Sequence, residues 1–351
     1  MVALAACQMS GATVSKASAR LCGCSPSASF AGSMRPITAF SSTPRGSGSW
    51  TMYRPHAGSA LSWSTAASTS AWVAVAGRSE ALEAWEAAET VGFPLIFKPI
   101  AGAGSADTWR ADSREVFEAV LSRTAHVPEA SVEELVEGDE LTYETICVDG
   151  APVLEGCCRY YPNVLEARKN EWISPIIFSL RDLGSEELRG GVELGRRALE
   201  ALGMETGFTH MEWFRTPEGE AVFGEVACRA PGASMVDLMN YAGDVDLFVE
   251  WARAVQQGTV EAPRENPYNA AIVFKRARGS GRIAAVEGLD AFQAAHGPHI
   301  ARVQLLPIGA PRRDWQQTFL SDGDLIVRHP DRETTLAMAQ EAARSIHLYA
   351  S

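Results

Sequence analysis

The chain has 351 residues, and its 43 acidic and 31 basic side chains give it a formal net charge of −12. This acidic balance excludes a general nucleic-acid-binding surface, because such a surface must neutralise phosphates along a duplex. No stretch reaches the roughly 18 apolar residues of a membrane span, so we expect a soluble protein with no membrane partner. With 46% hydrophobic residues the chain can bury a core, and its length predicts about two domains.

The acidic charge is confined to the part of the chain that starts at Glu80. Residues 1–79 contain six basic side chains and no Asp or Glu, whereas residues 80–351 carry 25 basic and 43 acidic ones. Sixteen serines lie between Ser10 and Ser70, without a sustained apolar period of a helix or a strand. This composition is typical of an organelle transit peptide, and also of GC-rich DNA read in the wrong frame, which the tryptophans of this segment favour. In either case we expect residues 1–79 not to fold independently.

The seven cysteines point to a structural role. Cys157 and Cys158 are adjacent, and Cys22 and Cys24 are separated by one residue, so neither pair has the spacing of a zinc site. Scattered, unpaired cysteines in a chain of this length are typical of a reducing compartment. We therefore expect a cytoplasmic protein.

Regular patterning begins with a predicted helix and a predicted strand. Ser79 is a candidate N-cap, the residues after it place Ala and apolar side chains at helical spacing, and Gly92 predicts the helix end. Residues 93–97 predict a short buried strand that leads to Lys98. The loop 101–106 reads Ala-Gly-Ala-Gly-Ser-Ala, and such a loop either forms a simple turn or brings backbone N–H groups close to an anion.

Two further strands are predicted between residues 131 and 148. They flank Gly138-Asp139, and Asp149-Gly150 after them predicts a tight hairpin turn. Several glutamates lie in the first run and at the start of the second. Taken alone, these glutamates indicate a solvated acidic edge.

Residues 208–229 predict a second hairpin that carries two carboxylates. Strand-like runs flank Pro217-Glu218-Gly219-Glu220, and a two-residue loop at Glu218-Gly219 places Phe214 opposite Phe223 and Glu212 opposite Glu225. Directly opposed side chains lie about 5 Å apart, where like charges are destabilising unless a cation lies between them. Oxygen ligands of this kind suit Mg²⁺.

Four motifs in this order resemble the ATP-grasp superfamily of carboxylate–amine and carboxylate–thiol ligases, which includes biotin carboxylase and D-alanine–D-alanine ligase. GFPLIFKP with GAGS is similar to the lysine strand and phosphate-covering loop of that family, and VEELVEGDE is similar to its adenine hinge. MEWF and GEVACR are similar to its two metal-carboxylate strands. The resemblance covers about residues 80–349.

The resemblance implies an α+β fold in which two lobes grip ATP. Residues 80–136 would form the first lobe, residues 137–262 the second lobe with the metal and substrate site, and residues 263–351 a β-rich closing lobe similar to that of the amino-acid ligases. The Rossmann-like domain that precedes the first lobe in this family would be missing or degraded, with residues 1–79 in its place.

The resemblance also implies roles for individual residues. Lys98 would contact the ATP phosphates and act in catalysis, and Glu140 would hold the ribose. Arg229 would lie beside the acyl phosphate, and His210 would either line the substrate side or be a satisfied strand residue. The metal ligands would be Glu212 and Glu225. The remaining nucleotide contacts would be Gly102, Gly104 and Ser105 in the covering loop, Glu133, Glu134 and Leu135 in the hinge, and Lys169 or its neighbour Arg168.

Two departures from the family pattern concern the metal and the phosphates. Ala227 stands where the family has an asparagine that binds a second Mg²⁺, so the number of metal ions is open. No Asp precedes Glu80, so the upstream Asp-Lys pair that supplies a second ATP lysine is absent.

The function implied by the resemblance is that of an ATP- and Mg²⁺-dependent ligase. It would activate a small-molecule carboxylate as an acyl phosphate and condense it with an amine. Two alternatives are a truncated or frame-disrupted remnant that binds nucleotide without turnover, and a small-molecule kinase on the same fold. The sequence indicates neither the two substrates nor the oligomeric state.

Overall fold

The computed structural model describes residues 81–99, 107–127, 129–263, 265–316, 318 and 321–351, together with the backbone of four earlier strands. Three of these strands form a small antiparallel sheet: β1 (Phe40–Ser42), β2 (Gly48–Met52) and β3 (Leu61–Thr65). In the described parts of the chain, no helix is both long and apolar enough to cross a membrane.

The first lobe is a four-stranded antiparallel sheet with two helices. The strand order is β4-β7-β5-β6. The elements are β4 (Val73–Gly77), α2 (Ala81–Val91), β5 (Leu95–Pro99), β6 (Trp109–Ala111), α3 (Arg114–Arg123) and β7 (Glu129–Glu134). Strand β4 therefore belongs to this sheet, although it precedes the boundary at residue 80 that the composition predicts.

The two faces of this sheet have different roles. On β5, Leu95 and Phe97 are buried in a core with residues of α2 and α3, and the Phe97 and Phe117 ring centroids lie 6.3 Å apart. Because side chains alternate along a strand, Ile96 and Lys98 point to the opposite face. The predicted end of the preceding helix is confirmed, since Gly92 has a φ of +83° and its N–H donates to the carbonyl of Ala88.

The second lobe is built on an eight-stranded sheet in which all neighbouring strands are antiparallel, with the order β12-β11-β8-β9-β10-β13-β17-β16. The strands are β8 (Asp139–Val148), β9 (Ala151–Tyr161), β10 (Ile176–Leu180), β11 (Gly207–Arg215), β12 (Ala221–Ala227), β13 (Asn269–Phe274), β16 (Ile300–Leu305) and β17 (Gly323–His329). The expected closing lobe thus contributes three strands to the same sheet. The predicted turn at Asp149-Gly150 is confirmed, because both residues have positive φ.

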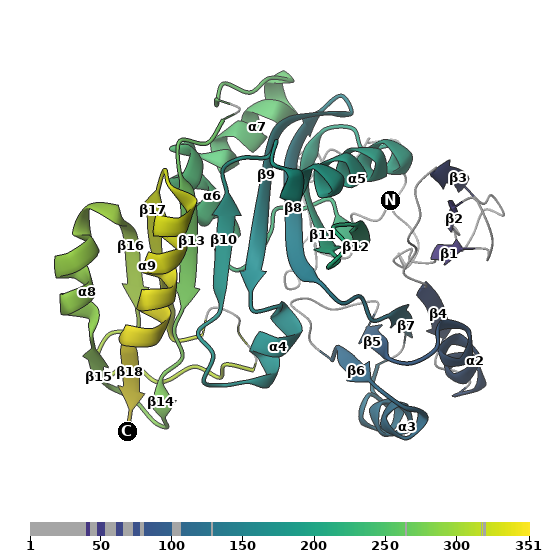
Figure 1. Cartoon of the computed structure of the whole chain (residues 1–351), viewed down its shortest axis with the longest axis horizontal. Coiled ribbons are helices and arrows are strands. Elements are labelled where there is room, and N and C mark those ends of the chain that lie inside the picture. The colour runs from purple at the N-terminus through teal and green to yellow at the C-terminus, as the bar shows by residue number, and fades with distance from the viewer. Residues whose placement is uncertain are drawn as a thin grey trace.

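Helices cover both faces of the large sheet (Figure 1). One face packs against α5 (Glu186–Leu202), α8 (Leu289–His296) and α9 (Arg332–Ser345). The other packs against α6 (Met235–Gly243) and α7 (Leu247–Gln257). The short α4 (Val164–Lys169) lies in the connection from β9 to β10. Strands β14 (Arg278–Gly279), β15 (Ile283–Glu287) and β18 (His347–Ala350) form a small separate sheet, and η1 (Gly297–His299) follows α8.

The β11–β12 hairpin corrects part of the predicted register. Thr216 donates its N–H to the Glu220 carbonyl, so the turn has three residues rather than two. This shift places Trp213, not Phe214, opposite Phe223. A bulge between Glu212 and Trp213 then inserts Gly224 on β12 and reverses the shift. As a result Glu212 does face Glu225, as predicted.

Candidate functional site

The site lies where the first lobe meets the end of the large sheet. Lys98, on the open face of the first-lobe sheet, forms an ion pair with Glu225 of β12. Burial opposes the charge on Lys98, but the carboxylates of Glu133, Glu225 and Glu212 outweigh it and hold the pKa of the lysine above its ordinary value. Residues separated by more than 100 positions are thereby brought into one charged cluster.

The two facing carboxylates fit a divalent cation that is also bound by a nucleotide. Glu212 and Glu225 are directly opposed and share one sheet face, and carboxylate oxygens are the ligands that Mg²⁺ prefers. The described residues contain no group of three or more His, Cys, Asp or Glu side chains that could hold a metal ion. An ion at this place would therefore complete its coordination with phosphate oxygens and water, as Mg²⁺ does in phosphate-transferring sites.

His210 links this pair to a further buried carboxylate. Its Nδ1 lies 3.0 Å from Oε1 of Glu144, and its Nε2 lies 3.5 Å from Oε1 of Glu212. Burial lowers the pKa of His210, but the hydrogen bonds and charges of the two glutamates outweigh this and raise it to about 9. The imidazole therefore carries a proton on each nitrogen at neutral pH and donates to both carboxylates.

Glu212 remains ionised in spite of its surroundings. Burial alone would raise the pKa of Glu212, but the hydrogen bond and charge of His210, and then the charges of Lys98 and Arg229, hold it below its ordinary value. Arg229 follows β12 and donates to the carbonyl of Ala230 at 3.0 Å. The structure therefore brings together four of the predicted site residues: Lys98, Glu212, Glu225 and Arg229.

Glu140 lies at the start of β8, where α4 fixes its carboxylate. The N–H of Val164 donates to Oε2 of Glu140 at 2.7 Å, and Oδ1 of Asn163 accepts from the Glu140 N–H at 3.3 Å. The Asn163 amide also donates to the carbonyl of Gly138 at 2.9 Å. Burial, with the charge of Glu212 acting in the same direction, raises the pKa of Glu140 to about 8.

The predicted hinge residues lie at the end of β7. The backbone of Glu133 is paired inside the sheet between β4 and β5, and its Oε1 accepts from the Ser131 hydroxyl at 2.6 Å. Glu134 is exposed. Leu135 donates its N–H to the carbonyl of Pro94 at 3.4 Å.

The other predicted phosphate contacts are Gly102, Gly104, Ser105 and Lys169 or its neighbour Arg168. Gly102, Gly104 and Ser105 lie outside the described residues. Lys169 is exposed at the end of α4, whereas its neighbour Arg168 donates to the carbonyl of Gln316 in the closing lobe at 2.8 Å.

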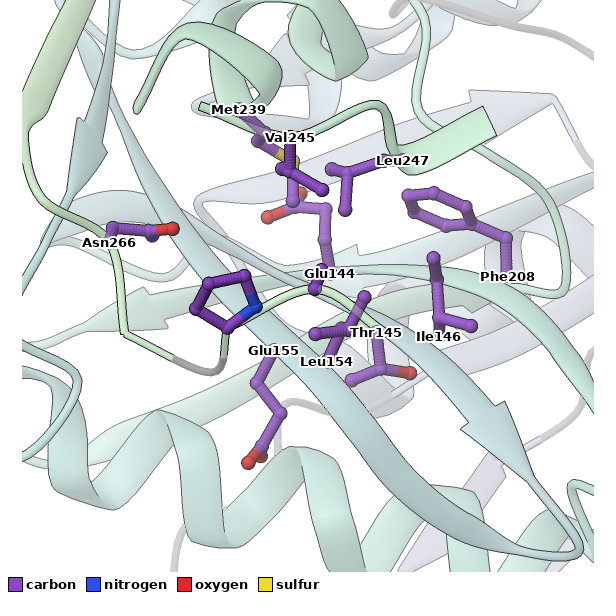
Figure 2. Close-up of a pocket in the computed structure, with 12 residues that line it drawn as sticks. Glu144, Thr145, Ile146, Leu154, Glu155, Phe208, Met239, Val245, Leu247 and Asn266 are labelled. Carbon is purple, nitrogen blue, oxygen red and sulfur yellow. The ribbon is translucent and has the colours of Figure 1, made fainter. Parts of the chain in front are cut away.

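Two residues of the site were not found from the sequence. Glu144 follows Thr142 by two residues on β8, so its side chain lies on the same face of the sheet, beneath α6 and α7 (Figure 2). Asn163 immediately precedes α4. The alternation along β8 could have placed Glu144 on the same face as Glu140. The pairing of Glu144 with His210 could not be predicted, because it depends on the register of β8 against β11 across 66 positions of sequence.

Comparison with known proteins gives relatives among carboxylate–amine ligases. The chain is 25% identical over 169 residues to the L-arginine-specific L-amino acid ligase of Bacillus subtilis, an alignment that covers 46% of this chain and 40% of that protein. The crystal structure of L-amino acid ligase from Bacillus licheniformis matches with a TM-score of 0.60 and 19% identity, over 74% of this chain and 64% of the other. No model of a known protein family matches the chain.

A second structural relative was solved with a nucleotide. It is the carboxyaminoimidazole ribonucleotide synthase of Aspergillus clavatus complexed with ATP, which matches with a TM-score of 0.56 and 16% identity over 77% of this chain and 66% of the other. The chain thus spans about two fifths of its curated relative and just under two thirds of both solved structures. These matches confirm the resemblance that four sequence motifs suggested: the described part of the chain has the ATP-grasp fold.

Proposed function

We propose that this protein is an ATP-dependent ligase that joins a small-molecule carboxylate to an amine. The observation that carries the proposal is the pair of opposed carboxylates, Glu212 and Glu225, with Lys98 of the other lobe against Glu225. Two carboxylates and a lysine at a junction of two lobes suit a bound triphosphate with its metal ion. The L-amino acid ligases and the ATP complex among the relatives support the same reading.

The proposed reaction has two steps. An oxygen of the substrate carboxylate attacks the γ-phosphorus of ATP, the bond to the β-phosphate oxygen breaks, and ADP leaves. The amine then attacks the carbonyl carbon of the acyl phosphate, phosphate leaves with the bridging oxygen, and the amine gives up a proton. No protein nucleophile is required, so positioning and charge neutralisation are what the chain must supply.

Each charged residue of the site supplies part of this positioning and charge neutralisation. Mg²⁺ held by Glu212 and Glu225 would neutralise phosphate oxygens. Lys98 and Arg229 offset the negative charge that develops on the transferred phosphoryl group and on the acyl phosphate. His210 holds the Glu212 carboxylate in place through its Nε2, which lies 3.5 Å from Oε1 of Glu212. Glu140, held by the Val164 N–H, is the proposed partner of the ribose hydroxyls.

We place the enzyme in the cytoplasm. Cys147, Cys157 and Cys158 are buried, and burial raises the pKa of all three thiols. Thiols of this kind are unreactive and are compatible with a reducing compartment.

A turnover assay with the full chain tests the proposal. ADP and phosphate are measured with ATP, Mg²⁺ and a panel of amino-acid pairs, and condensed product is followed by mass spectrometry. The proposal predicts that product forms in step with ADP. ATP binding in calorimetry without ADP release would instead favour the nucleotide-binding remnant. Accumulation of a stable phosphorylated substrate would favour a kinase.

A further inference from the structure

Helix α4, whose first N–H holds Glu140, is too short to keep its position alone. It has six residues, Val164–Lys169, and helices of fewer than about 12 residues are marginal in water unless other parts of the protein hold them. Its N-cap residue Asn163 makes no side-chain cap bond, since that side chain bonds instead to the backbone of Gly138 and Glu140. The orientation of α4 therefore depends on contacts at its other end.

Arg276 of the closing lobe supplies such a contact. Its Nη1 donates to the carbonyls of Ala167 and Asn170, both at 2.8 Å. The last four carbonyls of a helix lack partners within the helix, and the guanidinium pairs with one of them and with the residue that ends α4. Arg276 is only 8% exposed, so water competes little for these carbonyls.

The closing lobe in turn fixes the Arg276 guanidinium. Its Nε donates to the Ser321 hydroxyl at 3.3 Å, and its Cζ lies 4.8 Å from the ring centroid of Trp315. Arg276 comes two residues after β13, which is an internal strand of the large sheet. The anchor of α4 is thus built into the sheet and is not carried on a surface side chain.

Packing alone does not explain an arginine at this position. Burial, and then the charge of Arg168, lower the pKa of Arg276 to about 10, and the charge of Glu171 offsets this only in part. The guanidinium therefore still carries its charge at neutral pH, at a cost in free energy that an apolar side chain would not incur. What the arginine adds over an apolar residue is its set of donors for α4.

Two other contacts join the same segment to the closing lobe, and both are more exposed to solvent. Arg168 donates to the Gln316 carbonyl at 2.8 Å, and Arg312 forms an ion pair with Glu171. Charged contacts at the surface contribute little, because water and salt compete for them. Arg276 is sheltered from solvent, so it should dominate the position of α4.

We propose that Arg276 is a positioning residue for the nucleotide. By holding the end of α4, it keeps the Val164 N–H at the start of the helix on Oε2 of Glu140, and this bond sets the direction in which Oε1 meets the ribose hydroxyls. The inference rests on the proposed function, in which Glu140 is the partner of the ribose. Arg276 acts on the nucleotide only through α4.

Nucleotide binding without turnover tests this role. The Kd values of ATP and of 2′,3′-dideoxy-ATP are measured by calorimetry with Mg²⁺ and without a carboxylate substrate, because only ATP has the hydroxyls for the ribose contact. Arg276→Met keeps an unbranched chain and removes every donor, Arg276→Lys keeps one cationic donor group, and Glu140→Ala removes the ribose contact itself. The matched control is Arg302→Met, which breaks a partly buried arginine network between β16, β17 and α6 that does not involve α4.

Wild type should bind ATP about 10-fold or more tightly than dideoxy-ATP, as for one hydrogen bond to a carboxyl group. This ratio should fall in Arg276→Met to about that of Glu140→Ala. It should take an intermediate value in Arg276→Lys, because the shorter ammonium cannot reach both carbonyls. Arg302→Met should keep the wild-type ratio. Arg276→Lys carries the test if Arg276→Met does not fold.

Amide hydrogen exchange gives a second readout, since residues 163–170 should exchange faster in Arg276→Met than in wild type or Arg302→Met. Unchanged exchange in Arg276→Met would overturn the inference. A wild-type nucleotide ratio in both Arg276 variants, or a wild type that does not distinguish the two nucleotides, would overturn it as well. The proposed function can fail separately: the ratio would then respond to Arg276 as expected, while the turnover assay shows no ADP release.

Discussion

At the scale of single residues, Glu140 and Glu212 illustrate how two neighbouring carboxyl groups of the site differ in protonation. The carboxyl of Glu140 is buried and accepts from the Val164 N–H, and burial together with the charge of nearby Glu212 raises its pKa to about 8, so Glu140 is protonated at neutral pH. Glu212 in turn is kept ionised by His210, Lys98 and Arg229. In the free protein the site thus contains one neutral and one ionised carboxyl group next to each other.

The raised pKa of Glu140 predicts a pH-dependent effect of Glu140→Gln. The pKa of Glu140 is raised from 4.5 to about 8 on folding. Its proton therefore stabilises the folded state fully below pH 4.5, and this contribution is lost as the pH rises to about 8. We expect Glu140→Gln to gain unfolding free energy relative to wild type between pH 5 and pH 8.5, by about 1 kcal/mol or more.

Urea unfolding at a series of pH values, without nucleotide, measures this gain. Glu137→Gln, at an exposed position near the same hinge, is the control and should change the unfolding free energy by less than about 0.5 kcal/mol. A difference between Glu140→Gln and wild type that stays constant over this pH range would contradict the assigned pKa.

Arg229 is expected to act on the transition state. Its charge lies close enough to Glu212 to lower the pKa of that carboxyl, so it is positioned beside the proposed metal ligands. Replacing Arg229 with Ala should lower kcat about 10²- to 10³-fold, as for the loss of one oxyanion donor, while the Kd for ATP stays within a few-fold of wild type.

Steady-state kinetics and calorimetry with ATP separate the two effects. Arg189, exposed on α5, supplies the control variant Arg189→Ala. Equal losses in kcat for both variants, or a loss of ATP affinity that accounts for the whole effect in Arg229→Ala, would refute the catalytic role.

Sequence reasoning located the two opposed carboxylates, Glu212 and Glu225, but not the buried Glu144 that shares His210 with Glu212. Glu212 and Glu225 were found because a short hairpin fixes their relation locally. Glu144 was missed because its partner His210 lies on β11, which two strands and two helices separate from β8 along the chain. The relation between such residues is set by the order of strands in the sheet, which no local period encodes.

At the scale of elements, the β11–β12 hairpin positions Glu212 opposite Glu225 through its bulge. The three-residue turn shifts the register by one position, and Gly224 shifts it back just before Glu225. The predicted opposition of the two glutamates was therefore correct although the turn length was wrong. Composition indicated the turn, but nothing in the sequence signalled that a glycine within the strand was an extra residue.

Gly224→Ala should disturb this arrangement. An added Cβ would lie 2.8 Å from the carbonyl oxygen of Glu212, so the two strands must move apart at the site. We expect a loss of about 1–3 kcal/mol in unfolding free energy and weaker Mg²⁺ binding in the presence of ATP. Chemical denaturation and calorimetry measure the two quantities.

The matched control is Gly297→Ala. An added Cβ there meets no atom within 4 Å, and we expect a change within about 0.5 kcal/mol. If Gly224→Ala behaved like Gly297→Ala in both measurements, the bulge would not be what positions the carboxylates.

Helix α4 is held by hydrogen bonds from a residue of the closing lobe. The guanidinium of Arg276, which follows β13, donates to the carbonyls of Ala167 and Asn170 at the end of α4, both at 2.8 Å. It also lies 4.8 Å from the ring centroid of Trp315. Because α4 begins with the N–H that binds Glu140, the closing lobe contributes to fixing the proposed ribose site.

At the scale of the whole molecule, the site exists only because two lobes meet. Lys98 comes from the first lobe and the carboxylates from the large sheet, and the charged groups between them are satisfied in the free protein by the Lys98–Glu225 ion pair. The order of the four motifs identified this architecture. The placement of the closing strands in the same sheet was not predicted, because the β-rich tail carried no motif that indicated its partner.

The same organisation predicts that Mg²⁺ binding depends on nucleotide. The protein offers the ion two carboxylates, and no larger group of His, Cys, Asp or Glu ligands occurs among the described residues. Mg²⁺ alone should therefore leave the melting temperature nearly unchanged, whereas ATP with Mg²⁺ at about 100 times Kd should add about 2.7 kcal/mol of stability. Differential scanning fluorimetry with each ligand alone and with both measures this.

Glu225→Gln provides the comparison for this measurement. In this variant, adding Mg²⁺ to ATP should raise the melting temperature much less than it does in wild type. Equal stabilisation of wild type by Mg²⁺ with and without ATP would show that the ion is held elsewhere or by more protein ligands than the two glutamates.

The most direct test of the central claim follows the oxygen atoms of the activated carboxylate. An amino acid labelled with ¹⁸O in both carboxylate oxygens is incubated with ATP, Mg²⁺, an acceptor amine and the full chain, and the released phosphate is analysed by mass spectrometry. The two-step mechanism predicts one ¹⁸O in each phosphate and one in the new amide. Released phosphate without label would mean that ATP is hydrolysed by water rather than used to activate a carboxylate, and would contradict the ligase.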